Sequence, residues 1–291
     1  MNFLRQQQGA NPTAERALRA LGEAVGLARS TIWRQLRKPD FAPDADDVEV
    51  RHQIQTIALE MRSYGYRPIT KELQRRGFQI NHKRVLRLLR EDNLLCLRRR
   101  AFVCTTDSQH PYAVYPNLAR DLELTNLNQL WVSDITYIRL QREFIYLAVI
   151  LDAYSRRCIG WALSRIIDAR LTSAALKQAL QQRVILPGLI HHSDRGVQYA
   201  AADYVNILKE QQIQISMSRK GNPYDNAIAE RFMRTLKYEE VLMNDYETLA
   251  EVRASVHRFI DSVYNLKRLH SSLAYVPPIE FEASLLPLTP A

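Results

Sequence analysis

An aspartate in the middle of an apolar, strand-like run is the feature that most constrains the fold of this chain. Asp134 lies within residues 130–138, which are otherwise mostly apolar or β-branched, and Asp194 ends a second strand-like run at 189–193. A carboxylate beside apolar strands costs free energy unless a cation or a set of hydrogen-bond donors compensates it. A fold that buries these strands therefore has to place compensating groups around both aspartates.

The residue pattern from Leu130 onward predicts strands first and helices later. Three strand-like segments separated by short polar turns predict an antiparallel meander at 130–140, 143–151 and 157–163. The pattern then predicts, in order, a helix, a strand, a helix, a strand and a helix at 170–182, 188–193, 200–212, 213–217 and 223–238. Together these elements predict an α/β fold with a mixed five-stranded sheet flanked by helices. A last helix is expected over 247–264, before an irregular, proline-punctuated tail.

A third carboxylate, Glu230, lies in the helix predicted at 223–238. Asn222 is a suitable N-cap for this helix, Pro223 fits its first turn, and Asp225 completes a pattern that resembles a capping box. Helical periodicity places three polar side chains on or near the Glu230 face, namely Asn226, Arg234 and Lys237. Basic groups beside a carboxylate suit a site that also receives phosphates.

The three carboxylates together predict a metal site. Neighbouring parallel strands would bring Asp134 and Asp194 together, and the helix that carries Glu230 would cross the sheet beside them. Carboxylate ligands favour Mg²⁺ or Mn²⁺ over zinc, and two such ions roughly 4 Å apart would suit phosphodiester chemistry. Taken singly, a strand-end aspartate is also a common turn cap, and a helical glutamate is commonly solvated. The combination favours the metal site.

Positive charge is concentrated in one part of the sequence. Residues 51–100 contain 13 Lys and Arg against 4 Asp and Glu, a net of +9 that equals the net charge of the whole chain. Such a segment predicts a polyanionic partner, most simply nucleic acid, although a solvated basic helix surface has the same composition. After Asn81, a plausible helix cap, the basic residues expected along a DNA groove are Lys83, Arg84, Arg87 and Arg90, followed by Arg98, Arg99 and Arg100.

The chain is predicted to comprise five segments. Residues 1–45 predict short helices, arranged either as a helix-turn-helix with Gly26 at its turn or as a plain helical hairpin. The other four are a basic helix-turn-helix-like DNA-binding module, a connector, the core that contains the sheet, and a C-terminal helix with its tail, at 46–104, 105–127, 128–240 and 241–291.

Composition argues against a membrane or secreted protein. No apolar run reaches the roughly 18 residues of a membrane span, and the N-terminus lacks an apolar signal core. The three cysteines form no short-spaced pair, which argues against a zinc knuckle or a disulfide framework. We therefore expect a cytoplasmic protein with no membrane partner, associated with the nucleoid when it is bound to DNA.

Three blocks around the carboxylates resemble the catalytic blocks of the DDE transposases of bacterial insertion sequences. The blocks read WVSDITY at 131–137, HHSDRGVQY at 191–199 and DNAIAERF at 225–232. They are most similar to the second-frame product of the IS3 family, which belongs with the retroviral integrases. Further segments fit the same family, at 64–67, 69–70, 151–156, 160–161, 264–265 and 270–273.

This resemblance implies a ribonuclease H-like core preceded by small all-α helix-turn-helix modules. It implies that Asp134, Asp194 and Glu230 bind two Mg²⁺ or Mn²⁺ ions in a transposase that cleaves transposon 3′ ends and transfers them to another phosphodiester. The implied partners are double-stranded DNA of the terminal repeats and target, further copies of the chain on DNA, and a protein from an upstream reading frame. We expect Lys237, Arg234 and Arg231 to contact DNA phosphates, with a solvated helix face as the alternative for Arg231.

Two other functions stay open. A DNA-binding regulatory or assembly subunit would carry the triad without using it, and the sequence has no sustained heptad repeat for a zipper. A nuclease of the same fold acting on RNA–DNA hybrids would leave the two N-terminal DNA-binding modules without a purpose.

Some residues depart from the family pattern or lie beside the site. Leu269 stands where the family usually has proline and Ala274 where it usually has glycine, which affects expected DNA contacts near the C-terminus and not the chemistry. Asp152 is expected to stabilise a turn. His191 and His192 should point to opposite faces of their strand, so at most one of them reaches the carboxylates.

Overall fold

The computed structural model describes residues 45–92, 94, 113–219 and 223–285. Two compact units divide the chain between Gln53 and Ile54, within helix α3 (Ala45–Glu60). Several predictions fall outside the described residues: the helices expected before residue 45, the cap at Asn222, and the DNA contacts of Arg98, Arg99 and Arg100. Within the described part of the chain, no helix is both long and apolar enough to cross a membrane.

Two short amphipathic helices follow α3, namely α4 (Tyr66–Arg75) and α5 (His82–Glu91). Each buries one apolar face, formed by Ile69, Leu73, Val85, Leu88 and Leu89. The side chain of Asn81 accepts hydrogen bonds from the backbone N–H groups of Lys83 and Arg84, each at 3.0 Å, which confirms the predicted N-cap of α5.

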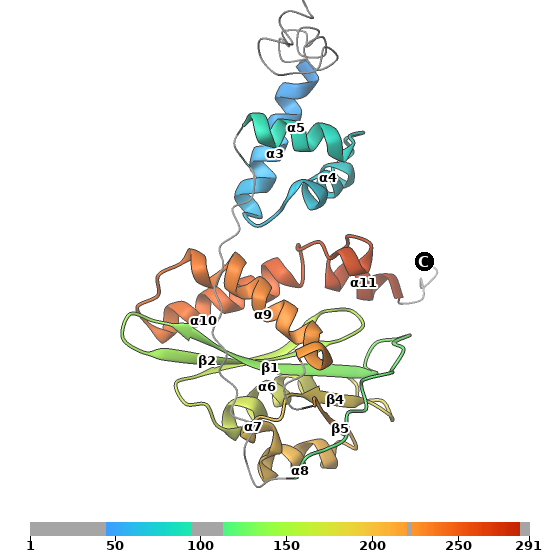
Figure 1. Ribbon diagram of the computed structural model, residues 1–291, viewed down its shortest axis with the longest axis vertical. Helices are drawn as coiled ribbons and strands as arrows, with labels where there is room; N and C mark the ends of the chain where they lie inside the picture. The colour runs from blue at the N-terminus through green and yellow to red at the C-terminus, as the bar shows by residue number, and fades with distance from the viewer. Residues whose placement is uncertain (1–44, 93, 95–112, 220–222, 286–291) are drawn as a thin grey trace, which may run out of the picture. The chain divides into compact units, whose positions relative to one another are not determined.

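A mixed five-stranded sheet forms the centre of the larger unit, as predicted (Figure 1). Its strands are β1 (Leu130–Arg139), β2 (Phe144–Asp152), β3 (Cys158–Ser164), β4 (Ile190–Ser193) and β5 (Gln214–Met217), in the order β3-β2-β1-β4-β5. The pairs β1–β2 and β2–β3 are antiparallel and form the predicted meander, whereas β1–β4 and β4–β5 are parallel. β1 is the central strand and has one neighbour of each kind.

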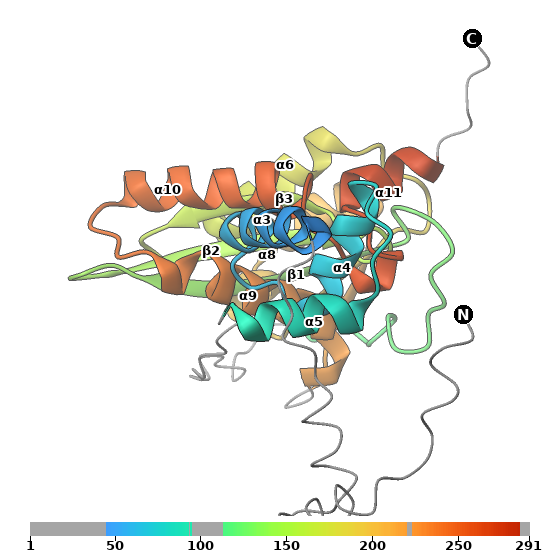
Figure 2. The ribbon, with the colours of Figure 1, turned by 90° about the horizontal axis from the view of Figure 1, so that it is seen from above.

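Helices cover both faces of the sheet (Figure 1). One face carries α6 (Ala169–Gln182), α7 (Val197–Ala200) and α8 (Ala202–Glu210). The other carries α9 (Ala227–Glu239) and α10 (Leu249–His257), which extends along the sheet (Figure 2) and continues as a π-helix at Arg258–Tyr264.

Alternation along β1 divides its side chains between the two faces. Trp131 packs with the α6–α8 side and Val132 with the α9–α10 side, as the two-residue period of a strand requires. By the same period, Asp134 lies on the α9–α10 side.

Residues 278–285 of the C-terminal tail are helical, so the prediction of an irregular tail was wrong for this segment. Helix α11 (Pro278–Leu285) begins at a proline, which is tolerated in a first turn, and it buries Glu282. The Glu282 carboxylate accepts hydrogen bonds from the Ser155 hydroxyl and the Arg157 guanidinium, each at 2.6 Å, and also pairs with Arg183. These partners lie 99 to 127 residues earlier in the chain, beyond the reach of any local sequence pattern.

The two departures from the family pattern have structural explanations. Leu269 is buried, and its backbone N–H donates a 2.7 Å hydrogen bond to the Tyr64 hydroxyl, a donor that proline would lack. Ala274 has a φ of +55°, in the left-handed region that glycine adopts without strain.

Ala274→Gly should therefore raise the free energy of unfolding by about 1 kcal/mol, because glycine relieves the left-handed strain at this position. Ala254→Gly is the matched control, since Ala254 is exposed within α10 and glycine there should cost about 1 kcal/mol. Denaturant unfolding would measure the free energy of unfolding, which should rise in Ala274→Gly and fall in Ala254→Gly. A loss of stability in Ala274→Gly equal to that in Ala254→Gly would contradict the prediction.

Candidate functional site

The parallel register of β1 and β4 sets the two aspartates level with each other. Val132 lies opposite His192, and two further residues along the same register bring Asp194, just past the end of β4, opposite Asp134. Partners in a parallel pair point to the same face, so both carboxylates lie on the α9 side. Their proximity is also visible electrostatically, since Asp194 raises the pKa of Asp134.

Helix α9 carries Glu230 to the same face. The α-helix begins at Ala227, after a 3₁₀ turn at Pro223–Asn226, rather than at residue 223. The Asn222 partner of the predicted capping box lies outside the described residues. The Asp225 carboxylate accepts hydrogen bonds from the backbone N–H of Arg219 at 2.9 Å and from the Arg219 guanidinium, a charged partner.

Asn226, at the end of the 3₁₀ turn, contacts the sheet. Its buried side-chain amide donates a 2.9 Å hydrogen bond to the backbone carbonyl of Ser133, the residue before Asp134. The sequence indicated that Asn226 lies near the Glu230 face and gave it no role. The structure shows that Asn226 anchors the start of α9 to β1 beside the carboxylates.

Negative charge is concentrated around Asp134, which lies near the other two carboxylates. Burial is the largest cause that raises the pKa of Asp134, to about 8; Asp194 and Glu230 raise it further, while the Ile135 N–H and Lys237 oppose the rise. Burial also raises the pKa of Glu230. In the described residues, no three His, Cys, Asp or Glu side chains lie close enough to hold a metal ion. The three carboxylates nevertheless lie on one face of the sheet, and their oxygen ligands are of the type that suits a hard divalent cation.

Lys237 and Arg234 lie on α9 beyond Glu230. The Lys237 ammonium lies 4.6 Å from the centroid of the Tyr137 ring, and Asp134 favours its charged form against the effect of burial, which lowers the pKa of Lys237. Arg234 is exposed, with its guanidinium 5.7 Å from the Tyr238 ring centroid. Both cations are therefore available on the helix that carries Glu230.

The basic residues of α5 differ in exposure. Lys83 and Arg90 are exposed, and Arg84 is partly exposed. Arg87 is held by Glu91 through a 3.0 Å ion pair one helical turn away, so its guanidinium is already engaged.

The two histidines before Asp194 are buried and hydrogen-bonded to hydroxyl groups of the protein. His191 bonds through Nε2 to the Tyr204 hydroxyl at 2.9 Å, and His192 bonds to the hydroxyls of Ser216 and Ser218 at 2.8 and 3.0 Å. Burial is the main cause that lowers the pKa of His191 to about 3 and that of His192 to about 4, so both rings are neutral.

Asp152 stabilises a turn, as predicted. Its carboxylate accepts hydrogen bonds from the backbone N–H groups of Asn128, Tyr154 and Ser155 at 2.7, 2.9 and 3.0 Å.

Gly196 fits closely against Asp194. Its N–H donates a 2.9 Å hydrogen bond to the Asp194 carboxylate, and a β-carbon there would lie 2.9 Å from that oxygen and 2.8 Å from Gln198 Oε1. Its φ is −66°, an ordinary value, so the glycine supplies room for the neighbouring side chains and not a special backbone conformation.

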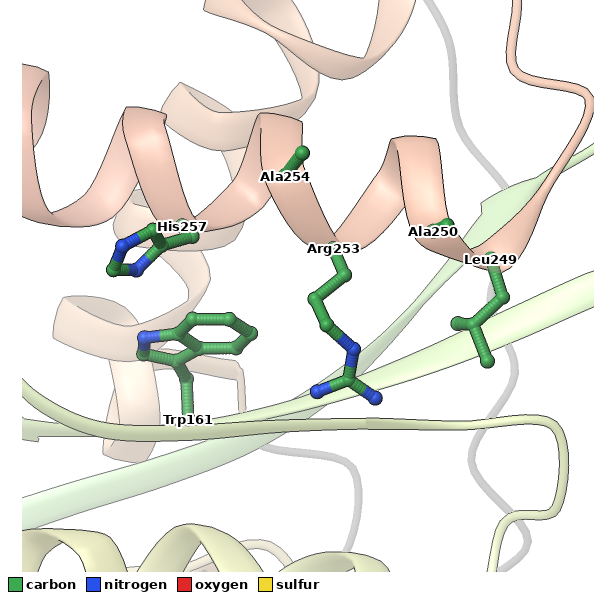
Figure 3. A pocket seen from close by; sticks show the side chains of 6 residues that line it. All are labelled: Trp161, Leu249, Ala250, Arg253, Ala254 and His257. Carbon is green, nitrogen blue, oxygen red and sulfur yellow. The ribbon is translucent and has the colours of Figure 1, made fainter.

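A hollow of about 640 Å³ lies apart from these residues, between β3 and α10 (Figure 3). It is lined by Trp161, Leu249, Ala250, Arg253, Ala254 and His257. None of the three carboxylates contributes to its wall, so it plays no part in the site described above.

The raised pKa of Asp134 has a consequence for stability in the absence of divalent metal. The folded chain holds its proton up to about pH 8, while the unfolded chain releases it near pH 4, so wild-type stability should fall between those values. Asp134→Asn has no such proton and should gain roughly 2 to 5 kcal/mol on wild type across this window, allowing for some solvent screening. Unfolding in EDTA from pH 4 to 9 measures the difference, and parallel pH profiles would contradict it.

Comparison with known proteins adds to this geometry. Models of an integrase core domain match residues 125–223 and 211–278, and a model of an HTH-like domain matches residues 45–102. The chain is 35% identical over 261 residues to an uncharacterized 31 kDa protein of insertion element IS600 from Shigella sonnei, covering 89% of this chain and 96% of that protein. It is 34% identical over 277 residues to transposase InsF of insertion sequence IS3A from Escherichia coli (strain K12), covering 92% and 95%.

Among solved structures, the chain is similar to the catalytic core domain of BIV integrase, with 22% identity, a TM-score of 0.41, and coverage of 54% of this chain and 95% of that one. The high coverage of the IS600 and IS3A proteins, together with the integrase-core and HTH-like matches, identifies the family. The chain belongs to the transposases of the IS3 family of bacterial insertion sequences.

Proposed function

We propose that this transposase cleaves the 3′ ends of its insertion sequence and transfers them to target DNA in a divalent-metal-dependent reaction. The observation that carries the proposal is the electrostatic coupling of Asp134 to Asp194 and Glu230 on one face of the sheet. Negative charge gathered at one place is suited to hard cations.

The three carboxylates would bind the metal ions, and the elements around them would set their orientation. Asp134, Asp194 and Glu230 would hold two Mg²⁺ or Mn²⁺ ions, because oxygen-only donor sets suit these cations. When bound, such ions supply a lowered pKa for a water or a 3′-hydroxyl and a counter-charge for the leaving oxygen. The chain itself orients the carboxylates, through the β1–β4 register for Asp194 and through the Asn226 contact with β1 for the helix that carries Glu230.

Basic side chains would bind the DNA. Arg234 and Lys237 would contact phosphates beside the carboxylates, and Lys83, Arg84, Arg87 and Arg90 of α5 would contact the groove or backbone through the HTH-like domain. Arg98, Arg99 and Arg100 would extend this contact. The proposal includes a homo-oligomer that pairs two ends, a possible partner from an upstream frame, and a cytoplasmic, nucleoid-associated location.

Asp134→Asn, Asp194→Asn and Glu230→Gln should each lower cleavage and strand transfer by at least roughly 1,000-fold, because an amide replaces an anionic metal ligand of similar size. Labelled terminal-repeat duplexes with Mg²⁺ or Mn²⁺ would measure both steps, and duplex binding in EDTA should be retained. Asp203→Asn, at an exposed carboxylate in the first turn of α8, is the matched control and should keep wild-type activity. Near-normal rates in any triad variant would refute the role of that residue.

The competing functions give different results in the same assay. A regulatory or assembly subunit would bind terminal repeats but neither nick nor join them with either metal. A hybrid-specific nuclease would cut RNA–DNA hybrids faster than duplex DNA.

A further inference from the structure

Arg156 lies in the turn between β2 and β3 with its guanidinium unpaired. Its Nε atom is buried and has no hydrogen-bond partner, and no ion pair joins its guanidinium to any residue that the structure describes. The nearby carboxylate of Asp152 is already bound by three backbone N–H groups. Burial is the main cause that lowers the pKa of Arg156, as expected for a cation without a counter-ion.

Two further groups face this cation. Arg231, exposed on α9, disfavours the charged form of Arg156, and both arginines disfavour the charged form of His270. His270 is only 9% exposed, packs edge-on against Tyr264 at 4.8 Å between ring centroids, and leaves its Nε2 without a partner. Burial is the main cause that lowers the pKa of His270, followed by the charges of Arg268, Arg156 and Arg231. Arg268 is itself held by a bidentate contact with Glu239.

The neighbouring residue shows that an arginine in this turn can be paired. Arg157 shares the buried carboxylate of Glu282 with Arg183, whereas Arg156, one position earlier, has no such acid. A partly buried guanidinium without a counter-ion is destabilising, and a bound anion would offset that effect. Arginine also matches the geometry of phosphate oxygens better than lysine does.

We propose that Arg156 and Arg231, with His270 as the wall between them and the protein interior, bind one backbone phosphate of duplex DNA. This site is distinct from the three carboxylates and rests on the proposed function, because that function brings duplex DNA to α9. Arg231 directly follows Glu230 in α9 and is exposed, so a strand lying along this helix passes its guanidinium.

The test is the salt dependence of duplex binding by the full chain in EDTA, which requires no cleavage. For the double variant Arg156→Gln/Arg231→Gln, we expect the slope of log K against log salt to become less steep by about 0.9, the contribution of one phosphate. Arg142→Gln/Arg165→Gln removes the same charge at the opposite end of β2 and should leave the slope unchanged. Unchanged slopes in the Arg156→Gln/Arg231→Gln variant would overturn the proposal.

Comparing a terminal-repeat duplex with a duplex of unrelated sequence identifies the DNA that supplies the phosphate. A loss confined to a duplex that carries the terminal repeat assigns the phosphate to the transposon end. A loss seen on a duplex of unrelated sequence, alone or in addition, assigns it to backbone binding of the kind that target DNA requires.

Arg231→Glu separates ligand binding from a structural role. The new carboxylate would neutralise Arg156 within the protein, so the thermal unfolding midpoint should rise while duplex affinity falls by more than tenfold. Because Arg231 is exposed, this variant should fold even if Arg156→Gln does not. A lower midpoint with wild-type affinity would refute the site. If wild type cleaves DNA but the double variant keeps the wild-type slope, only this inference fails. If the double variant shows the expected change in slope but wild type never cleaves DNA, only the proposed function fails.

Discussion

The parallel pairing of β1 with β4 is the contact on which the carboxylate site depends. Its register sets Asp194 level with Asp134, and the backbone of the same strand receives Asn226 and so locates α9 with Glu230. One strand therefore determines the position of all three carboxylates. A slip of one residue in β1 would send Asp134 to the α6 side of the sheet and separate it from Glu230. The long antiparallel pairing of β1 with β2, from Trp131 to Arg139, makes such a slip costly.

Much of the fold could be predicted because local sequence patterns determine it. The meander follows from apolar alternation and short polar turns, and the Asn81 cap follows from a side chain that bonds to N–H groups two and three residues ahead. Helix α11 and the role of Asp225 could not be predicted. Glu282 is stabilised by Arg157 and Arg183, far away in sequence, and no local pattern reveals partners of that kind.

The candidate site was likewise predictable only in part. The residue types of Asp134 and Asp194, one within a strand and one at a strand's end, indicated their approach, and helical spacing indicated that Lys237 shares a face with Glu230. The anchoring role of Asn226 and the close fit of Gly196 depend on distances between segments that only the folded chain defines. The unpaired Arg156 was equally invisible, because the sequence shows a charge without showing which neighbours lack one of opposite sign.

The contact of Glu282 with Ser155, Arg157 and Arg183 also affects the order in which a ribosome-bound chain can finish folding. The sheet and α9 emerge during synthesis well before α11, yet two arginines beside the sheet stay without their carboxylate until residue 282 has left the ribosome. A prematurely terminated product would contain Asp134, Asp194 and Glu230 on an incompletely stabilised core.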